Sequence, residues 1–139
     1  MILELGGHTD GLHGTPCKMK VLVQSLHSGQ FSEHQPRHGG IVHFDQGPTA
    51  VVRSIESPLT LILASRRMVP FSLQQLRSCD LEPRAFRVLV AKGVHAPLAA
   101  YREVCDTFLR INTPGSTCAD LQQIHFRRRR TPMFPWEDE

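Results

Sequence analysis

The sequence predicts an α/β fold, with α+β left open as a variant: a mixed β-sheet of about six or seven strands with two or three short helices, in a single domain. Three observations support this. The 139 residues are 40% hydrophobic and 21% charged, as in one ordinary globular domain. Short β-branched runs bounded by glycine or proline fill the first half. In the second half, two apolar runs flank a helical start signal.

The first half contains a series of short apolar or alternating runs, and we expect each of them to be a strand. They cover residues 2–5, 18–26, 41–44, 49–55 and 59–64. A glycine-rich stretch, residues 6–16, separates the first two runs and is expected to be a loop. Ser28 and Gly29 are expected to form a hairpin turn that leads into Phe31.

The second half is expected to contain the helices. Ser72 predicts the start of a short helix through Leu76, because a serine side chain can accept a hydrogen bond from a free amide of the first turn. Pro97 fits the first position of a helix that ends near Cys105. A last short helix is expected over residues 117–124, where an acidic residue follows a threonine by three positions.

Two apolar runs lie on either side of the helix that begins at Pro97. Residues 86–91 precede it and residues 107–111 follow it, and both are rich in residues that favour strands. A strand–helix–strand passage can place two parallel strands in one sheet. We therefore expect both runs to be strands of the central sheet.

Charge and apolar content exclude several classes of protein. Sixteen Lys and Arg against thirteen Asp and Glu leave a net charge of +3, with no broad basic face of the kind that binds nucleic acid. The longest strongly apolar stretch, residues 59–64, is far shorter than the ~20 residues of a membrane-spanning helix. The four cysteines are widely spaced, which is typical of reduced thiols in a cytoplasmic protein.

His8, Asp10 and His13 lie close together in the glycine-rich loop. Imidazole and carboxylate groups at such short spacing can meet around one cation when the backbone folds back on itself. The alternative is a turn stabilised by the Asp10 side chain, with two exposed histidines. A metal site at these three residues is the weaker of the two interpretations, because a loop provides no fixed arrangement for the ligands.

Lys92 and His95 form a second candidate site, just before the helix that begins at Pro97. A cation and a titratable donor near the free amides of a helix start can hold a carboxylate. The alternative is a lysine that extends past the sheet and a histidine near the helix cap. The sequence around these residues favours this alternative over a binding role.

A third candidate is the cationic run formed by Arg127, Arg128, Arg129 and Arg130. Aromatic residues follow it, so it can in principle grip phosphates or an acidic partner. The three acidic residues at positions 137–139 would partly cancel its field. We favour an extended C-terminal strap whose arginines pair with carboxylates and in which Phe134 and Trp136 pack as anchors.

Five sets of residues follow one another along nearly the whole chain. They are residues 5–10 with 14–16, 45–52, 86–101, 112–117 and 128–136. Together they resemble the C-terminal domain of the MlrC family, the microcystinase C-like proteins classed as M81 metallopeptidases. The full-length members of this family are similar to zinc-dependent hydrolases, and one branch opens linearised microcystin-type peptides.

The resemblance implies that the chemistry lies outside these residues. In the family, the metal site and the catalytic carboxylate are associated with an N-terminal domain that has no counterpart among the 139 residues. The chain would then be the C-terminal domain alone, either an excised segment or a fragment of a split protein. We accordingly expect no catalytic residue and no cofactor in it, with zinc in the full-length relatives.

Two positions depart from the family pattern. His8 stands where the family more often has lysine, which favours a basic role over a metal-ligand role. Lys92 and His95 match a Lys-Ser…His-Phe-Arg pattern, but the arginine is replaced by Leu98. If that arginine contacts substrate in the relatives, the loss of it implies a different substrate here.

The expected function is that of an accessory domain that completes a substrate cleft and is inert alone. Lys92, His95 and residues 6–14 would face a peptide or small amide substrate across from the N-terminal domain. The alternative is a stand-alone binding module that holds acidic partners with its arginine run. Self-association is also possible, through an apolar patch left by the missing domain.

Overall fold

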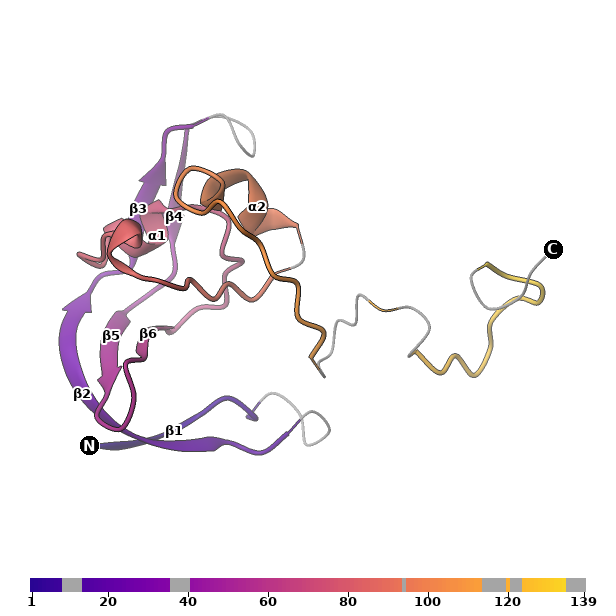
Figure 1. The fold of residues 1–139 in the computed structure, drawn as a ribbon, viewed down its shortest axis with the longest axis horizontal. Coiled ribbons are helices and arrows are strands. Elements are labelled where there is room, and N and C mark those ends of the chain that lie inside the picture. The colour runs from indigo at the N-terminus through magenta and orange to yellow at the C-terminus, as the bar shows by residue number, and fades with distance from the viewer. Residues whose placement is uncertain (9–13, 36–40, 94, 114–119, 121–123, 135–139) are drawn as a thin grey trace. The chain divides into compact units, whose positions relative to one another are not determined.

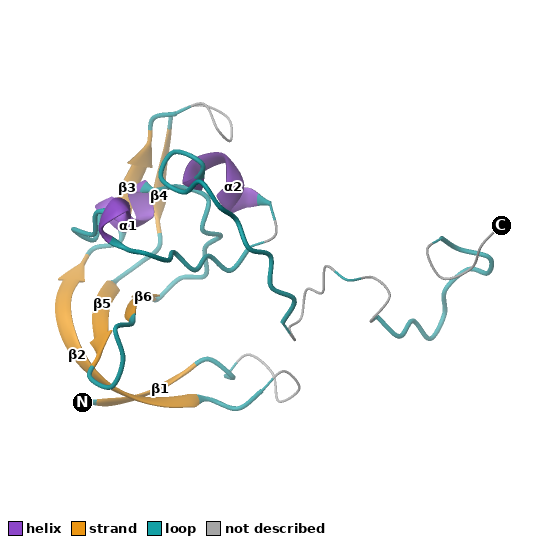
Figure 2. Cartoon of the chain, in the orientation of Figure 1, coloured by secondary structure: helices purple, strands orange, loops and turns teal. Residues whose placement is uncertain are grey.

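A computed structural model describes residues 1–8, 14–35, 41–93, 95–113, 120 and 124–134. Over these residues the chain forms six strands in two sheets, two short α-helices and one 3-10 turn (Figure 1). Strands predominate over helices, and the two kinds of element are segregated along the chain (Figure 2). The fold class is confirmed in its α+β variant.

The chain divides into two compact units. The first unit comprises Met1–Glu4 and Lys18–Phe108, and the second comprises Leu5–Cys17 and Leu109–Glu139. Nearly all residues of the described strands, and both described helices, belong to the first unit. The geometry that follows therefore concerns mainly that unit.

The larger sheet has the strand order β1-β2-β5-β6. These strands are β1 (Ile2–Leu5), β2 (Cys17–His27), β5 (Thr49–Ser54) and β6 (Thr60–Ala64). β5 runs antiparallel to both β2 and β6, so that Val52 lies between Val23 and Leu61. All four strand positions agree with the prediction within two residues, because each was marked by β-branched residues and a bounding glycine or proline.

The smaller sheet pairs β3 (Gln30–Glu33) with β4 (Val42–Asp45) in antiparallel register. On its inner face Phe31 lies opposite Phe44, with ring centroids 5.3 Å apart. The ring of Phe71 meets that of Phe44 edge-on at 4.7 Å. This aromatic cluster attaches the small sheet to the segment that leads into the first helix.

Gly29 makes the connection between β2 and β3. Its φ of +78° lies in the left-handed region, and a Cβ atom there would lie 1.9 Å from the Gly47 carbonyl oxygen. The predicted hairpin turn at Ser28 and Gly29 is wrong, because the chain passes from β2 to β3 without a turn or bend at these residues. β2 and β3 belong to different sheets, because β2 takes β5 as its partner and β3 takes β4.

The first helix, α1 (Gln74–Arg77), begins two residues later than predicted. The Ser72 hydroxyl accepts the Gln74 N–H at 3.0 Å, as a capping serine does. The Gln75 side-chain oxygen accepts the N–H groups of Phe71 and Ser72 at 3.0 and 3.2 Å. Ser72 is fully buried and also donates its hydroxyl proton to the buried carboxylate of Glu33, which joins the helix start to β3.

The second helix, α2 (Ala96–Tyr101), is shorter than predicted. The chain beyond Tyr101 continues as a turn, with the Glu103 N–H bonded to the Ala100 carbonyl and the Val104 N–H to that of Tyr101. The helical core cluster consists of buried residues from both helical regions, with Ile62 of β6 packed against them. Its members are Leu73, Leu76, Ala100 and Tyr101.

Two predicted strands are wrong. Residues 86–91 and 107–111 are not part of any described ladder, and a 3-10 turn, η1 (Pro83–Ala85), comes directly before the first of them. Their strand-like composition is not sufficient, because a strand also needs a hydrogen-bonding neighbour. The expected parallel pair is therefore not formed between described residues. Most of the helix predicted over residues 117–124 lies outside the described residues.

None of the helices formed by the described residues combines the length and apolar character that crossing a bilayer requires.

Candidate functional site

Lys92 and His95 lie on the loop that leads into α2, and both side chains are exposed. Gly93 lies between them, and a Cβ atom at that position would come within 3.1 Å of the Pro97 ring. His95 immediately precedes α2, and its side chain makes no capping hydrogen bond to a described residue of the helix. His95 therefore lies at the cap position of the helix, as the alternative interpretation expected, and both side chains are exposed.

The glycine-rich loop candidates are only partly within the described residues. His8 is exposed and belongs to the second unit, whereas Lys92 and His95 belong to the first. Asp10 and His13 lie outside the described residues. The roles proposed for these three loop residues stay predictions.

The arginine run also belongs to the second unit. Arg127, Arg128 and Arg130 are exposed, and Arg129 is half-buried and engaged in an interaction. Phe134 was expected to anchor the strap, but its side chain is 88% exposed. Within its own unit Phe134 is therefore not packed, and its role as an anchor of the strap stays a prediction. Trp136 lies outside the described residues.

The described residues do not fit a zinc ion. Within the ranges that the structure describes, no three His, Cys, Asp or Glu side chains come close enough to hold a metal. Cys17, Cys79 and Cys105 form no disulfide bond within the described part of the chain. The described residues therefore provide no set of ligands for the zinc ion that the family resemblance implies. We assign no chemical step to zinc in this chain.

Burial also determines the protonation state of two titratable groups. Burial raises the pKa of the Cys79 thiol, with a smaller opposing effect from its hydrogen bond to Ser78. Burial likewise raises the pKa of Tyr101 to about 12. Both groups stay protonated at neutral pH, so Cys79 is a packed core residue and has no nucleophilic thiolate.

The outer face of the β3–β4 sheet carries a polar cluster that the sequence did not reveal. Gln30 lies opposite Asp45, and Ser32 lies opposite His43 in the register of the two strands. The Ser32 hydroxyl and His43 Nδ1 are 2.7 Å apart. These four side chains line a shallow surface depression. Alternation within each strand could be read from the sequence, but the register that joins the two strands could not.

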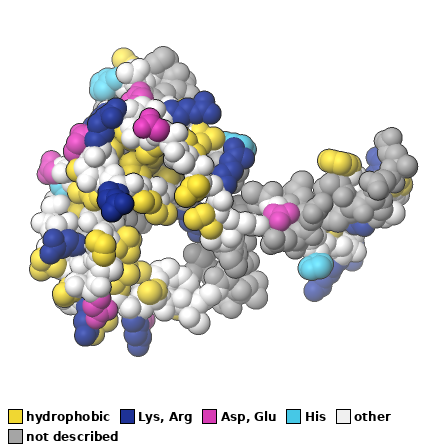
Figure 3. Space-filling model, viewed as in Figure 1, with side chains coloured by type: hydrophobic (Ala, Val, Ile, Leu, Met, Phe, Trp, Pro, Cys, Tyr) yellow, Lys and Arg dark blue, Asp and Glu magenta, His cyan; other side chains and the backbone are white. Residues whose placement is uncertain are grey.

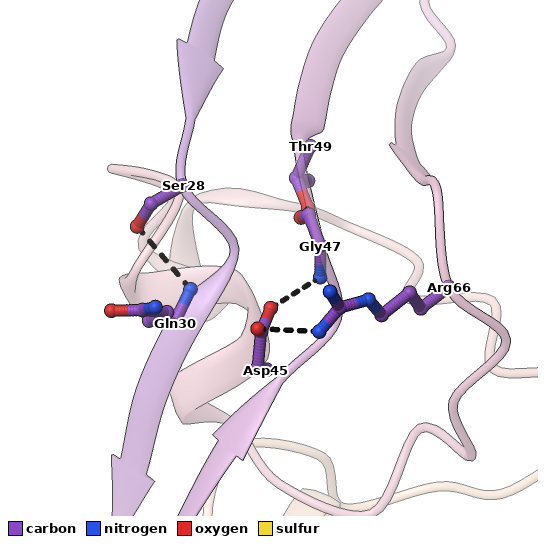
Figure 4. A network of polar contacts seen from close by, with 6 residues as sticks. All are labelled: Ser28, Gln30, Asp45, Gly47, Thr49 and Arg66. Carbon is purple, nitrogen blue, oxygen red and sulfur yellow. Dashed lines mark hydrogen bonds and ion pairs between the residues drawn. The ribbon is translucent and has the colours of Figure 1, made fainter.

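Asp45 is the most heavily engaged side chain of this cluster (Figure 4). Its Oδ1 accepts the Gly47 N–H at 2.7 Å, and its Oδ2 pairs with Arg66 Nη1 at 2.5 Å. The Thr49 hydroxyl in turn donates to the Gly47 carbonyl at 2.8 Å. The Asp45 carboxylate therefore organises the turn between β4 and β5, within one of the motifs that carry the family resemblance.

This geometry does not assemble a hydrolytic triad. Among the described residues no hydrogen bond joins Asp45 to His43, and Arg66 neutralises the carboxylate instead. A serine hydroxyl needs a histidine that is itself oriented by a third group before it acts as a nucleophile. The cluster can donate and accept hydrogen bonds with a polar partner, and we assign it no catalytic role.

A second shallow depression, lined mostly by apolar atoms, lies on the larger sheet. Its lining includes Leu26, Ala50 and Leu63, which are directly opposite one another across β2, β5 and β6. Figure 3 shows hydrophobic side chains interspersed with lysine and arginine on the face of the first unit that it presents.

Comparison with known proteins gives one match. A model of the family described as MlrC C-terminus matches residues 1–128. No curated protein and no solved structure matches the chain. The matched range includes every residue of the loop candidates and of the β3–β4 cluster described above.

Proposed function

The chain belongs to the MlrC C-terminus family, as its motifs predicted, and from this membership we propose that it is the accessory domain of an MlrC-like metallohydrolase. The observation that carries the proposal is the family match over residues 1–128. In this proposal a zinc ion and the catalytic carboxylate belong to a separate N-terminal domain. The substrate is a peptide or a small amide.

The described chemistry supports a role in binding. Lys92 and His95 are exposed on a loop next to a tightly packed glycine, so they can meet a ligand without rearrangement of the core. A lysine ammonium is a suitable partner for a carboxylate, and an imidazole can donate to a peptide carbonyl. These two residues would form part of one wall of the substrate cleft. A role of His8 in contacting the substrate is a separate proposal.

The proposal predicts that the isolated chain does not hydrolyse peptides or amides. Activity should appear when the chain is combined with the N-terminal domain of a full-length MlrC-family protein. Turnover by the isolated chain that is abolished by Lys92→Ala would contradict the proposal.

Within such an active complex, Lys92→Ala should raise KM about tenfold while the zinc content stays unchanged, since one charge-assisted contact is lost. Lys20→Ala is the matched control, because Lys20 is an exposed lysine of β2 that pairs with Glu56. An unchanged KM in Lys92→Ala would show that Lys92 does not contact the substrate in the cleft.

The metal content of the purified chain provides an independent test. Protein prepared without chelator and dialysed against zinc should retain less than one equivalent. One equivalent of zinc that is lost in a His8→Ala/His13→Ala variant would assign a metal site to the glycine-rich loop, and it would overturn the accessory role.

A further inference from the structure

Residues 87–91 have the sequence and side-chain pattern of a strand. Leu89 and Ala91 are half-buried and pack against the helical core cluster. Val88 and Val90 point away from it and are 75% and 89% exposed. Burial that alternates with a period of two indicates an extended backbone, and Phe86 just before the segment has φ −104° and ψ 136°.

Among the described residues, no strand pairs with the backbone of this segment. Phe86 still donates its N–H to Pro83, but no backbone hydrogen bond joins residues 87–91 to any described residue. The stretch that leads into α2 is accordingly drawn as loop (Figure 2). An extended apolar segment with free N–H and C=O groups is a template for strand addition by another chain or domain.

The charges around the segment indicate which kind of strand completes it. Arg87 at one end and Lys92 just beyond the other are both exposed. If two copies of the chain paired antiparallel about Leu89, Arg87 of each copy would lie opposite Ala91 of the other. A parallel pair in register would place Arg87 opposite Arg87 and Lys92 opposite Lys92, which is unfavourable across a strand pair. In neither arrangement do residues 87–92 of the second copy supply a carboxylate for the two cations.

We propose that residues 87–91 pair through backbone hydrogen bonds with an edge strand of the N-terminal domain, a strand that is apolar in its centre and acidic at its ends. This inference rests on the proposed function, because it takes the N-terminal domain as the partner. Pairing would also bring the directly following Lys92 and His95 to the boundary between the two domains. The segment would thus set the position of the proposed cleft residues.

Hydrogen exchange tests the proposal. The probe is the separately expressed N-terminal domain of a full-length MlrC-family protein, titrated into this chain. Amides within residues 88–91 should exchange rapidly in the chain alone. In the complex, those that face the added strand should slow by at least about tenfold, because they become hydrogen-bonded.

Two pairs of variants separate backbone pairing from charge. Val90→Pro removes one N–H and should weaken the complex about tenfold or more, whereas Val90→Thr keeps the N–H and should change Kd less than about twofold. Arg87→Glu should weaken the complex about tenfold at low salt and less at high salt. Arg67→Glu is its control, because Arg67 is also an exposed arginine of the first unit.

The outcomes are distinguishable. A complex in which residues 88–91 stay unprotected overturns the strand pairing and leaves the accessory role intact. Failure to form any complex overturns both. Protection of the segment in the chain alone, at concentrations where the chain self-associates, overturns the choice of partner in favour of a second copy.

Discussion

β5 and residues 87–91 are two short β-branched segments with very different surroundings. β5 has an antiparallel neighbour on each edge, and Val51 and Val52 are both buried. Residues 87–91 bury only Leu89 and Ala91, in part, and their backbone makes no hydrogen bond to a described residue. Residues 87–91 are held in place by the side chains of one face. β5 is held by side chains on both faces and by hydrogen bonds along both edges.

The difference teaches that a strand is a property of a pair of segments. Local composition makes a segment able to extend, but hydrogen bonds to a neighbour make it a strand. A segment that packs by one face and lacks neighbours exposes both apolar side chains and polar backbone groups. Such a segment contributes little to the stability of the isolated chain, which makes the comparison testable.

The largest expected effect comes from proline in the two segments. Val51→Pro should lower the free energy of unfolding by about 3 kcal/mol or more, because it removes a ladder hydrogen bond in a central strand and introduces a clash. Val90→Pro should lower it by less than about 1 kcal/mol in the isolated chain. Urea unfolding followed by circular dichroism measures both. Similar losses of unfolding free energy at the two positions would show that residues 87–91 are held as firmly as β5.

A second effect concerns how firmly the connection between the two sheets is fixed. Gly29→Ala should destabilise the chain by about 2 kcal/mol or more, because the new Cβ meets the Gly47 carbonyl and φ is +78°. Gly6→Ala is the control, with φ +70° and no atom within 4 Å of the new Cβ, and it should cost about 1 kcal/mol. Thermal unfolding compares the two, and equal losses would show that conformation alone sets the cost.

A third effect tests the buried link between β3 and α1. Ser72→Ala should lower the free energy of unfolding by about 1–3 kcal/mol, because it removes the hydroxyl that donates to the buried Glu33 carboxylate. Ser28→Ala is the matched control, since its exposed hydroxyl accepts only a 3.4 Å hydrogen bond from Gln30, and it should cost less than about 0.5 kcal/mol. Equilibrium urea unfolding provides both values. An unchanged free energy of unfolding in Ser72→Ala would show that the hydrogen bond between Ser72 and Glu33 does not stabilise the fold.

The last effect concerns the helical core cluster, against which Leu89 and Ala91 pack. It is the smallest at neutral pH, because it appears only in alkali. Burial raises the pKa of Tyr101 from 10.0 to about 12, so the folded state holds this proton more tightly than the unfolded state. The corresponding stability is complete below pH 10 and is lost as the pH rises toward 12. The loss should reach about 1–3 kcal/mol.

Tyr101 is the single tyrosine of the chain, so tyrosinate absorbance reports on it alone. The folded chain should titrate well above the unfolded chain in denaturant. Tyr101→Phe should remove most of the stability loss between pH 10 and 12. An ordinary titration midpoint in the folded chain would mean that the cluster is open to water.

The paired strands were the most predictable part of the fold. β1, β2, β4, β5 and β6 all lie within two residues of the predicted ranges, because alternation and bounding glycine or proline are local signals. The start of α1 was also predicted from Ser72, whose hydroxyl bonds the first turn. The same local rules predicted strands at 86–91 and 107–111, which pair with no strand in the described ranges.

The candidate site was less predictable. Lys92 and His95 could be chosen from the sequence because they lie on a loop between an apolar run and a helix start, and both are exposed in the structure. The contact between Ser32 and His43 could not, since eleven positions separate them and only the pairing of β3 with β4 brings them together. The same holds for Arg66 and Asp45.

The sequence by itself determined the α+β class, the positions of most strands and, through its motifs, membership of the MlrC C-terminus family. Only the tertiary structure decided that β2 pairs with β5 while β3 pairs with β4, and that residues 87–91 make no backbone hydrogen bond to a described residue. The physical reason is that side-chain periodicity is encoded over a few consecutive residues, whereas strand pairing depends on segments far apart in the chain.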